Sequence, residues 1–404
     1  MTKALEGIRV IDLSHVLAAP TTTMFLADLG AEVIHLEPPH GDDAREYGPF
    51  AGEPGKNHSG YFISLNRNKK SLVLNLKLDK GREILRELVR VADVIVENFR
   101  PSTMRKMGFG WEELQKLNPR IIYAAISGFG HDSPPEYAAR PSYDMVAQAY
   151  SGLMSITGPV GGPPCRVGSS VGDILAGQQA VIGILAALAY REKTGRGQFY
   201  DGSMVDGLFA VLESAVARYT MTGKVPGPLG GAHPSITPFE AFRTKDSWVI
   251  VAAGNNQLWA KLCRILNRED LILDPRFESN HLRTENQPKL SEILTGELVK
   301  KTTGEWIEIF EKQQIPYSRI NNMKDICEDP VIRHRNMLVT VDQPDVGPVR
   351  IAGSPIRLSE TPGAVVSPAP LLGEHSEEVL RTVLGYDQER IEALKAEGVI
   401  NSAL

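Results

Sequence analysis

The chain is poor in cysteine and has no concentration of positive charge. Its 404 residues include only Cys165, Cys263 and Cys327, which lie too far apart to form a disulfide framework or a metal-binding pair. This favours a reducing compartment. Lys and Arg number 44 against 49 Asp and Glu, a net charge of −5, and no dense basic tract occurs. The charge pattern argues against binding to nucleic acid.

Targeting features and long apolar runs are also scarce. The first residues, MTKALEG, lack the apolar region of a signal peptide. The longest expected apolar helix, the uncharged stretch of residues 174–190, contains Gln178 and Gln179 and is shorter than a membrane span requires. We therefore expect a cytoplasmic protein that does not contact membranes.

What the chain does contain is enough apolar material for a large core. Hydrophobic residues make up 42% and charged residues 23%, which is ordinary for a globular protein. Its length exceeds the usual limit of a single core. Residues 223–231 are rich in Gly and Pro, as linkers are. We expect a large domain over residues 1–224, a small domain over 225–325, and a return to the large domain over 326–404.

Short apolar runs alternate with helical patterns in the first half of the chain. The expected strands are residues 8–13, 31–36, 71–76, 92–96 and 121–126, and the expected helices between them are 20–30, 80–91 and 111–117. Such strand–helix–strand units build parallel sheets, so the fold class is α/β. Later patterns predict helices at 174–190, 205–219, 257–266, 290–298, 304–313, 376–384 and 388–397, and strands at 248–252 and 349–357.

The first unit lacks the signature of a dinucleotide site. The turn after its first strand, SHVLAAP (14–20), contains no glycine, and no P-loop pattern occurs. Glu37, at the end of the second strand, resembles a ribose-binding acid but is weak on its own. We expect no redox cofactor.

Asp173 is the strongest candidate for chemistry. It ends the segment GSSVGD (168–173), directly before the uncharged stretch. From the residues alone, an N-cap is the simpler interpretation. The same amides would hold the carboxylate ionised, and an ionised carboxylate beside Gly172 can attack an activated acyl group. Both roles remain open.

Two further segments are candidates for ligand binding. Asn98, Phe99 and Arg100 follow a predicted strand, where ligands bind in open α/β sheets, and Arg100 and Lys106 could meet phosphates. A polar surface loop explains them equally well. His233 follows Gly230 and Gly231 in a segment expected to be mobile and near a cleft, although a lone His is usually structural. No partner lies at metal-ligand spacing, so we expect no metal site.

Seven short motifs occur in an ordered series. They are LEGIRVIDL (5–13), LADLGAEVI (26–34), NRNKKSL (66–72), ENFRP (97–101), GD (172–173), KTGRGQ (193–198) and LLGEH (371–375). Each is weak alone, but their order and spacing are specific. From residue 5 to about residue 384 the chain resembles the family III CoA-transferases, the CaiB/BaiF family, which includes formyl-CoA:oxalate transferase, carnitine CoA-transferase and the α-methylacyl-CoA racemases.

The resemblance implies a fold and an activity. The fold is a doubly wound Rossmann-like large domain plus a smaller α+β domain, in a homodimer of interlocked rings. Asp173 matches the nucleophile, which attacks an acyl-CoA to give an aspartyl anhydride and then an aspartyl-CoA thioester. Coenzyme A and acyl-CoA are substrates, small carboxylic acids are partners, and no metal or redox cofactor takes part.

The resemblance also assigns contacts with CoA and substrate. The CoA-binding positions are His15, Val16, Leu17, Ala18, Leu74, Asn75, Leu76, Lys77, Asn98, Phe99, Arg100, Lys106 and the segment from Pro141 through Tyr143 and Asp144, and the substrate loop carries Gly230, Gly231 and His233. Formyl-CoA:oxalate transferase has Gln in place of Leu17, an adenine-stacking Arg in place of Pro38, and a longer run of glycines in the mobile loop. We therefore do not expect oxalate specificity, and we expect Arg45 or Phe99 to hold the adenine.

Three activities are compatible with these motifs. Racemases of the family carry His before the matching Asp, because epimerisation needs two bases, whereas this chain has Tyr143, a poor base. A transferase is therefore favoured over a racemase. A non-catalytic CoA-binding subunit of a heteromeric transferase is the third alternative, and the presence of Asp173 argues against it. Basic residues near the expected cleft suggest a dicarboxylate such as succinate as one partner.

Overall fold

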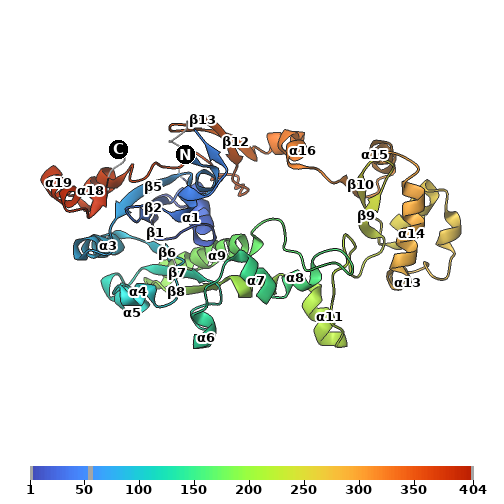
Figure 1. Cartoon of the computed structure of the whole chain (residues 1–404), viewed down its shortest axis with the longest axis horizontal. Helices are drawn as coiled ribbons and strands as arrows, with labels where there is room; N and C mark the ends of the chain where they lie inside the picture. The colour runs from blue at the N-terminus through green and yellow to red at the C-terminus, as the bar shows by residue number, and fades with distance from the viewer. Residues whose placement is uncertain (1–2, 53–57, 402–404) are drawn as a thin grey trace. The chain divides into compact units, whose positions relative to one another are not determined.

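The computed structural model describes residues 3–52 and 58–401 of the chain. Two compact units are formed, each from segments that are distant in the sequence (Figure 1). The first unit comprises Met1–Leu153, Val167–Val216 and Pro330–Leu404, and the second comprises Met154–Arg166 and Ala217–Asp329.

The first unit is built on a seven-stranded sheet. Its strands are β1 (Arg9–Asp12), β2 (Glu32–Glu37), β5 (Lys69–Leu74), β6 (Val94–Glu97), β7 (Ile122–Ser127), β8 (Phe199–Ser203) and β14 (Ile400–Asn401). They lie in the order β14-β5-β2-β1-β6-β7-β8, and every neighbouring pair is parallel except β14 with β5. The strand order reverses between β1 and β6, and ligands of open α/β sheets bind at the carboxyl ends of strands beside such a reversal.

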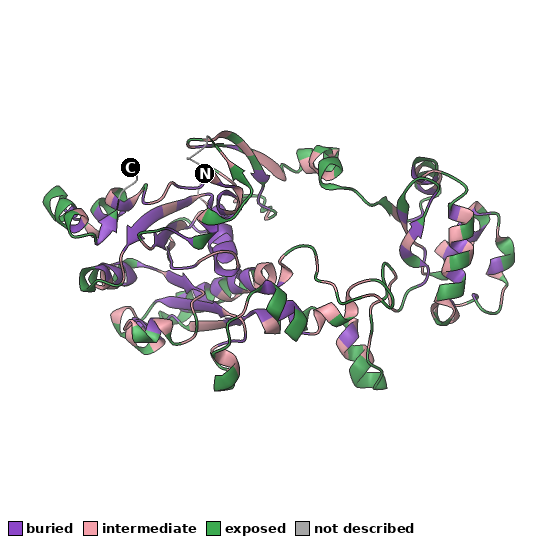
Figure 2. Cartoon of the chain, in the orientation of Figure 1, coloured by how far each residue is buried: buried purple, intermediate pink, exposed green. Residues whose placement is uncertain are grey.

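Helices cover both faces of this sheet, because alternate strand residues enter two different cores. Val10 belongs to the core shared with α1 (Ala18–Asp28) and α9 (Val171–Thr194). Its neighbour Ile11 belongs to the core shared with α3 (Asp79–Val91), α5 (Trp111–Leu117) and α18 (Ser376–Leu384). The central strands are accordingly almost entirely buried, whereas the edge strands β8 and β14 are only partly buried (Figure 2). The fold is α/β, as predicted.

Shorter elements complete the first unit. They are η1 (Asp43–Glu46), α2 (Gly60–Asn66), α4 (Thr103–Lys106), α6 (Pro135–Ala138), α7 (Asp144–Tyr150), α10 (Met204–Ala210), α17 (Pro330–His334), α19 (Gln388–Ala396), the pair β3 (Phe50–Ala51) and β4 (His58–Ser59), and the ribbon of β12 (Leu338–Gln343) and β13 (Gly347–Ala352). The chain passes from the first unit to the second within α8 (Leu153–Ile156) and α11 (Ser214–Thr222), and it returns between residues 166 and 167 and between residues 329 and 330.

The motif LLGEH (371–375) fastens the end of the chain to β5. The hydroxyl of Ser71 accepts a hydrogen bond from the Gly373 N–H at 2.8 Å, and the Ser71 N–H donates to Nδ1 of His375 at 3.3 Å. These contacts lie on the strand against which β14 pairs. The motif therefore has a structural role in the first unit.

The second unit is a small α+β fold. Three antiparallel strands, β9 (Phe239–Arg243), β10 (Trp248–Ala252) and β11 (Tyr317–Arg319), lie in the order β11-β10-β9. The helical elements are α12 (Asn256–Ile265), η2 (Glu269–Ile272), α13 (Asn280–Glu285), α14 (Gln287–Leu298), α15 (Thr303–Lys312) and α16 (Met323–Glu328). The core contains Trp259, Phe277, Trp306 and Phe310.

Two expectations about helices are wrong. Residues 205–219 form parts of α10 and α11 rather than one helix, because Glu213 between them has a φ of 54°. Helix α9 begins at Val171 and has 24 residues, so it is long and apolar enough to cross a membrane by length and composition alone. It contributes to the core of the first unit against α1. The absence of membrane contact therefore stays a prediction.

Candidate active site

The loops that follow β1 and β6 are joined at the carboxyl edge of the sheet. The His15 N–H donates to the amide oxygen of Asn98 at 2.8 Å, and the Asn98 amide nitrogen donates to the His15 carbonyl at 2.8 Å. The rings of His15 and Phe99 lie 5.4 Å apart. The side chain of Asn98 thus connects the two loops.

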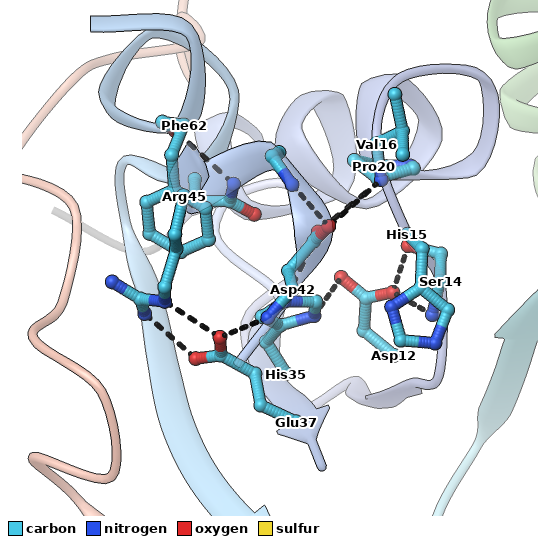
Figure 3. A network of polar contacts seen from close by, with 12 residues as sticks. Asp12, Ser14, His15, Val16, Pro20, His35, Glu37, Asp42, Arg45 and Phe62 are labelled. Carbon is cyan, nitrogen blue, oxygen red and sulfur yellow. Dashed lines mark hydrogen bonds and ion pairs between the residues drawn. The ribbon is translucent and has the colours of Figure 1, made fainter. Parts of the chain in front are cut away.

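The backbone of Val16 is held in an unusual conformation by Asp42. Val16 has a φ of 66°, which is an outlier for a β-branched residue and costs about 1–3 kcal/mol. Its N–H donates to both carboxylate oxygens of Asp42 at 3.2 Å (Figure 3). The Asp42 N–H in turn donates to Glu37 at 3.0 Å.

The expectation that Arg45 holds adenine gains no support. Its guanidinium donates two hydrogen bonds of 2.7 Å to Glu37 and lies 3.7 Å from the centre of the Phe62 ring. Among the residues that the structure describes, Arg45 lines neither of the two cavities below. Glu37, which accepts these hydrogen bonds, lines the second of those cavities, so its match to a ribose-binding acid stays a prediction.

A cavity of about 270 Å³ lies beside the joined loops within the first unit. It brings together nine of the predicted site residues, namely His15, Val16, Leu17, Ala18, Asn98, Phe99, Arg100, Tyr143 and Asp173. Pro141 also lines it, as do two residues that the sequence analysis did not select, Arg140 and Asp43. Two carboxylates, Asp43 and Asp173, and two guanidinium groups, Arg100 and Arg140, therefore line the same cavity.

A second cavity, of about 690 Å³, lies at the carboxyl ends of β1, β2 and β5. It is lined by the predicted residues Leu74, Asn75, Leu76 and Lys77, together with others that include Pro38, His40 and Arg82. His15 and Phe99 line both cavities. The two cavities therefore adjoin at the ring pair of His15 and Phe99, and most of the predicted CoA contacts line one or both of them.

Asp173 is not the N-cap of its helix. Helix α9 begins at Val171 after Ser170, so Asp173 is its third residue, and the helix has no side-chain cap. Among the described residues, no group donates a hydrogen bond to the Asp173 carboxylate. Burial, and secondarily the negative charge of Asp144, raise the pKa of Asp173 to about 7. The expectation that helix amides keep it ionised is therefore also wrong.

Asp144 positions this helix and lines neither cavity. Its carboxylate accepts hydrogen bonds from the Gly172 N–H at 2.8 Å and from Gln148 at 2.7 Å, and it is buried at the start of α7. A Cβ on Gly172 would lie 3.1 Å from an oxygen of Asp144, so a side chain there would disturb this contact. Tyr143, by contrast, is 72% exposed and does line the first cavity.

Close packing of α1 against α9 brings Asp173 beside the first loop. A Cβ on Gly177 would lie 2.6 Å from the Ala18 carbonyl oxygen, and the Thr22 hydroxyl donates to the Gly177 carbonyl at 3.1 Å. Only glycine permits this approach. A glycine inside an apolar helix was the one signal in the sequence that could have indicated it.

Tyr61, from α2, is a neighbour of the site that the sequence analysis missed. Burial raises its pKa to about 12, and the charge of Asp173 contributes to the shift. Its hydroxyl is therefore protonated at neutral pH and able to donate a hydrogen bond. Nothing in the local sequence GYFISLN (60–66) distinguishes this tyrosine from a core residue.

The remaining predicted residues lie elsewhere. Lys106 is exposed at the end of α4 and lines neither cavity. Gly230, Gly231 and His233 belong to the second unit, where Gly230 has a φ of 61° and the His233 ring stacks on Phe239 at 5.3 Å. Their role as a substrate loop stays a prediction. Within residues 3–52 and 58–401, no cluster of three His, Cys, Asp or Glu side chains could hold a metal ion.

Comparison with known proteins identifies the family. The sequence model described as CoA-transferase family III matches residues 5–376. The chain belongs to this family. It is 42% identical over 400 residues to the succinyl-CoA:glutarate CoA-transferase of Mus musculus, covering 98% of this chain and 90% of that protein. It is 42% identical over 367 residues to the acetyl-CoA:oxalate CoA-transferase of Acetobacter aceti, covering 89% and 92%.

A solved structure shows the same fold. The crystal structure of a CAIB/BAIF family protein from Brucella suis superposes with a TM-score of 0.83 at 35% identity, covering 94% of this chain and 99% of that one. The predicted membership of the family III CoA-transferases is confirmed, and with it an enzyme that transfers CoA to a carboxylic acid. The racemase and the non-catalytic subunit are no longer needed to explain the motifs.

Proposed function

We propose that this family III CoA-transferase moves CoA between two dicarboxylic acids, with Asp173 as the nucleophile. The observation that carries the proposal is the position of Asp173. It is a half-buried carboxylate without a hydrogen-bond donor among the described residues, in a cavity that adjoins a larger one. The relatives from mouse and Acetobacter are named for glutarate and oxalate, which are both dicarboxylates.

The two cavities suit the two ends of an acyl-CoA. The larger cavity offers apolar walls and the cations Lys77 and Arg82 to the nucleotide and its phosphates. The pantetheine arm passes His15, and the thioester then lies beside Asp173. Phe99 provides the stacking surface for adenine, in place of the arginine that is absent at position 38.

The reaction proceeds by exchange at carbonyl carbon atoms. A carboxylate oxygen of Asp173 attacks the thioester carbon, the carbon–sulfur bond breaks, and the CoA thiolate leaves a mixed anhydride. The thiolate then attacks the Asp173 carbonyl. This attack releases the donor acid and leaves Asp173 as an aspartyl-CoA thioester. The acceptor carboxylate attacks that carbonyl and releases thiolate, and thiolate then attacks the acceptor carbonyl. Asp173 is regenerated and the acceptor leaves as its CoA ester.

The second carboxylate of each acid requires a cation. Arg100 and Arg140 both line the first cavity, and a guanidinium can bind a carboxylate through two parallel hydrogen bonds. We infer that these arginines select dicarboxylates such as succinate and glutarate. Arg140→Gln is therefore expected to raise the KM for glutarate more than the KM for a monocarboxylate of similar length. An equal rise for both acids would contradict this assignment.

The interlocked homodimer is part of the proposal. Large apolar side chains are exposed on neighbouring helices of the first unit: Met145 on α7 is 53% exposed, Ile182 on α9 67%, and Phe209 on α10 55%. Exposed apolar groups of this size are typical of an interface between subunits. Light scattering on the purified protein is expected to give twice the chain mass of 44.3 kDa. A monomer would contradict it.

Trapping the acyl-enzyme tests the nucleophile. The protein is mixed with succinyl-CoA, acetyl-CoA or other acyl-CoAs, quenched with hydroxylamine and digested, and peptides are analysed by mass spectrometry. We expect a hydroxamate on the peptide containing Asp173, and its absence in Asp173→Ala. Asp43→Asn is the matched control, because Asp43 is an exposed carboxylate that lines the same cavity and should leave the hydroxamate in place. CoA binding without any hydroxamate would contradict the role of Asp173.

A further inference from the structure

A buried network of charges lies directly beneath the first loop. Asp12, His35 and Lys69 are each fully or almost fully buried, and Asp42 is 1% exposed. The ring of His35 lies between two carboxylates, with Nδ1 3.3 Å from Asp12 and Nε2 3.8 Å from Asp42 (Figure 3). Lys69 donates to Asp12 at 3.1 Å. Burying charged groups costs free energy, so a buried network of this kind is a candidate for a functional role.

The network reaches the loop after β1 through Asp42. Asp42 is the residue that accepts the N–H of Val16 with both oxygens. It also accepts the Ala44 N–H at 2.9 Å, and its own N–H is held by Glu37. Asp42 is therefore fixed from two sides, and the Val16 peptide is the movable partner in this contact.

The contact between the Val16 N–H and Asp42 holds Val16 against the preference of valine for negative φ. A valine with a φ of 66° lies in the left-handed region, which β-branched residues avoid. Glycine would adopt this conformation freely, but the chain has valine here. Without an acceptor at Asp42, the Val16 peptide would relax towards negative φ and would turn its N–H to a new direction.

We propose that Asp42 is a positioning residue for CoA transfer, because it holds the Val16 backbone in the left-handed conformation that shapes the wall of the cavity containing Asp173. The inference rests on the proposed function in one respect, namely that the thioester of acyl-CoA lies in this cavity. Val16 lines the cavity, whereas Asp42 does not and acts only through Val16. A shift of about 1 Å in such a wall can cost about a hundredfold in rate.

The test separates backbone positioning from simple structural damage. Asp42→Ala is measured alone and in combination with Val16→Gly or Val16→Ala, using kcat/KM for CoA transfer from succinyl-CoA to glutarate. We expect Asp42→Ala alone to lower kcat/KM by about a hundredfold. Adding Val16→Gly should restore about tenfold, because glycine adopts positive φ without the aid of Asp42. Adding Val16→Ala should restore nothing, since alanine also loses the branched side chain but keeps the left-handed penalty.

Asp28→Asn provides the control for stability. Asp28 is a buried carboxylate at the far end of α1, paired with Arg67 at 2.7 Å, and it has no contact with the loop. It should lower the thermal midpoint as Asp42→Ala does, but leave the KM for acyl-CoA unchanged. The proposal would be overturned if Asp42→Ala lowered kcat/KM equally in the chain with Val16 and in the chain with Val16→Gly. Rescue by Val16→Ala as large as that by Val16→Gly would also overturn it.

The role of Asp173 as nucleophile and the role of Asp42 as positioning residue are tested by different measurements. The same set of variants is compared by calorimetric titration with CoA, and the wild-type enzyme is tested for the Asp173 hydroxamate. If the hydroxamate is absent while Val16→Gly still rescues Asp42→Ala in kcat/KM and in CoA binding, the nucleophile lies elsewhere and the positioning role stands. If the hydroxamate is present but the rescue is absent, Asp173 is the nucleophile and the role of Asp42 is refuted.

Discussion

The raised pKa of Asp173 predicts that CoA transfer is lost on mild acidification. Only the ionised carboxylate can attack a thioester, and the pKa of Asp173 is about 7 because of burial first and the charge of Asp144 second. With that pKa, roughly one tenth of the enzyme is ionised at about pH 6 and roughly nine tenths at about pH 8. The value of kcat/KM should therefore fall about tenfold over this range.

The assay is a pH profile of kcat/KM for the acyl-CoA, because this quantity reports ionisation of the free enzyme. The yield of Asp173 hydroxamate after a short reaction should follow the same curve. Asp144→Asn removes one cause of the shift, so the midpoint should move to lower pH. The amide oxygen of the new side chain can still accept the Gly172 N–H, which keeps the start of α9 in place.

Two results would refute this reasoning. A carboxyl group with the ordinary pKa of 3.8 is ionised at both ends of the range, so a flat profile between about pH 6 and about pH 8 would show that burial does not control Asp173. A midpoint that rises in Asp144→Asn would show that the charge of Asp144 is not one of the causes.

Three further changes have expected outcomes. Because the folded pKa of Asp173 is raised, the stabilising contribution of its neutral form is complete below pH 3.8 and lost as the pH rises through about 7. Asp173→Asn should therefore raise the thermal midpoint near pH 8 and change it little near pH 4, and equal midpoint shifts at both would contradict this. Asn98→Ala removes both links to His15 and should raise the KM for acyl-CoA about tenfold, whereas an unchanged KM would refute the loop contact. Gly177→Ala should lower both the thermal midpoint and kcat, whereas Gly296→Ala in α14, with open space around its Cβ position, should leave kcat unchanged; similar effects of the two would contradict the close packing of α1 and α9.

The first part of the site could be predicted because its causes are local. The apolar runs around β1, α1 and β2 fix a strand–helix–strand unit, and the carboxyl ends of parallel strands share one edge. His15 to Ala18, which the resemblance assigned to CoA binding, lie near Asn98 to Arg100 because the structure places β1 beside β6. The two loops are indeed joined through Asn98.

The ionisation of Asp173 could not be predicted, because its causes are distant in the sequence. In the folded helix the Gly172 N–H is one of the free first-turn amides, and it donates to Asp144, 28 residues earlier, rather than to Asp173. The helix also begins before Asp173 rather than after it, which places the carboxylate in the first turn without an amide. Local propensity can suggest a cap, but only tertiary contacts decide which group receives the N–H.

The buried and half-buried carboxylates of the first unit differ in their partners, and this difference supports the proposal that Asp173 is the nucleophile. Burial alone would raise the pKa of Asp12 and of Glu37, but cationic neighbours lower both, and Glu37 with Arg45 reaches about 2. Such groups stay charged and fix the fold. Burial also raises the pKa of Glu97 to about 7, yet its oxygens accept the Tyr123 hydroxyl and the Phe99 N–H, and it lines neither cavity. Asp173 combines a raised pKa, an oxygen pair free of donors among the described residues, and a place in the cavity wall. The proposed nucleophile must form and break an anhydride and a thioester bond in every cycle, and a cation or a hydrogen-bond donor on its carboxylate would weaken its attack.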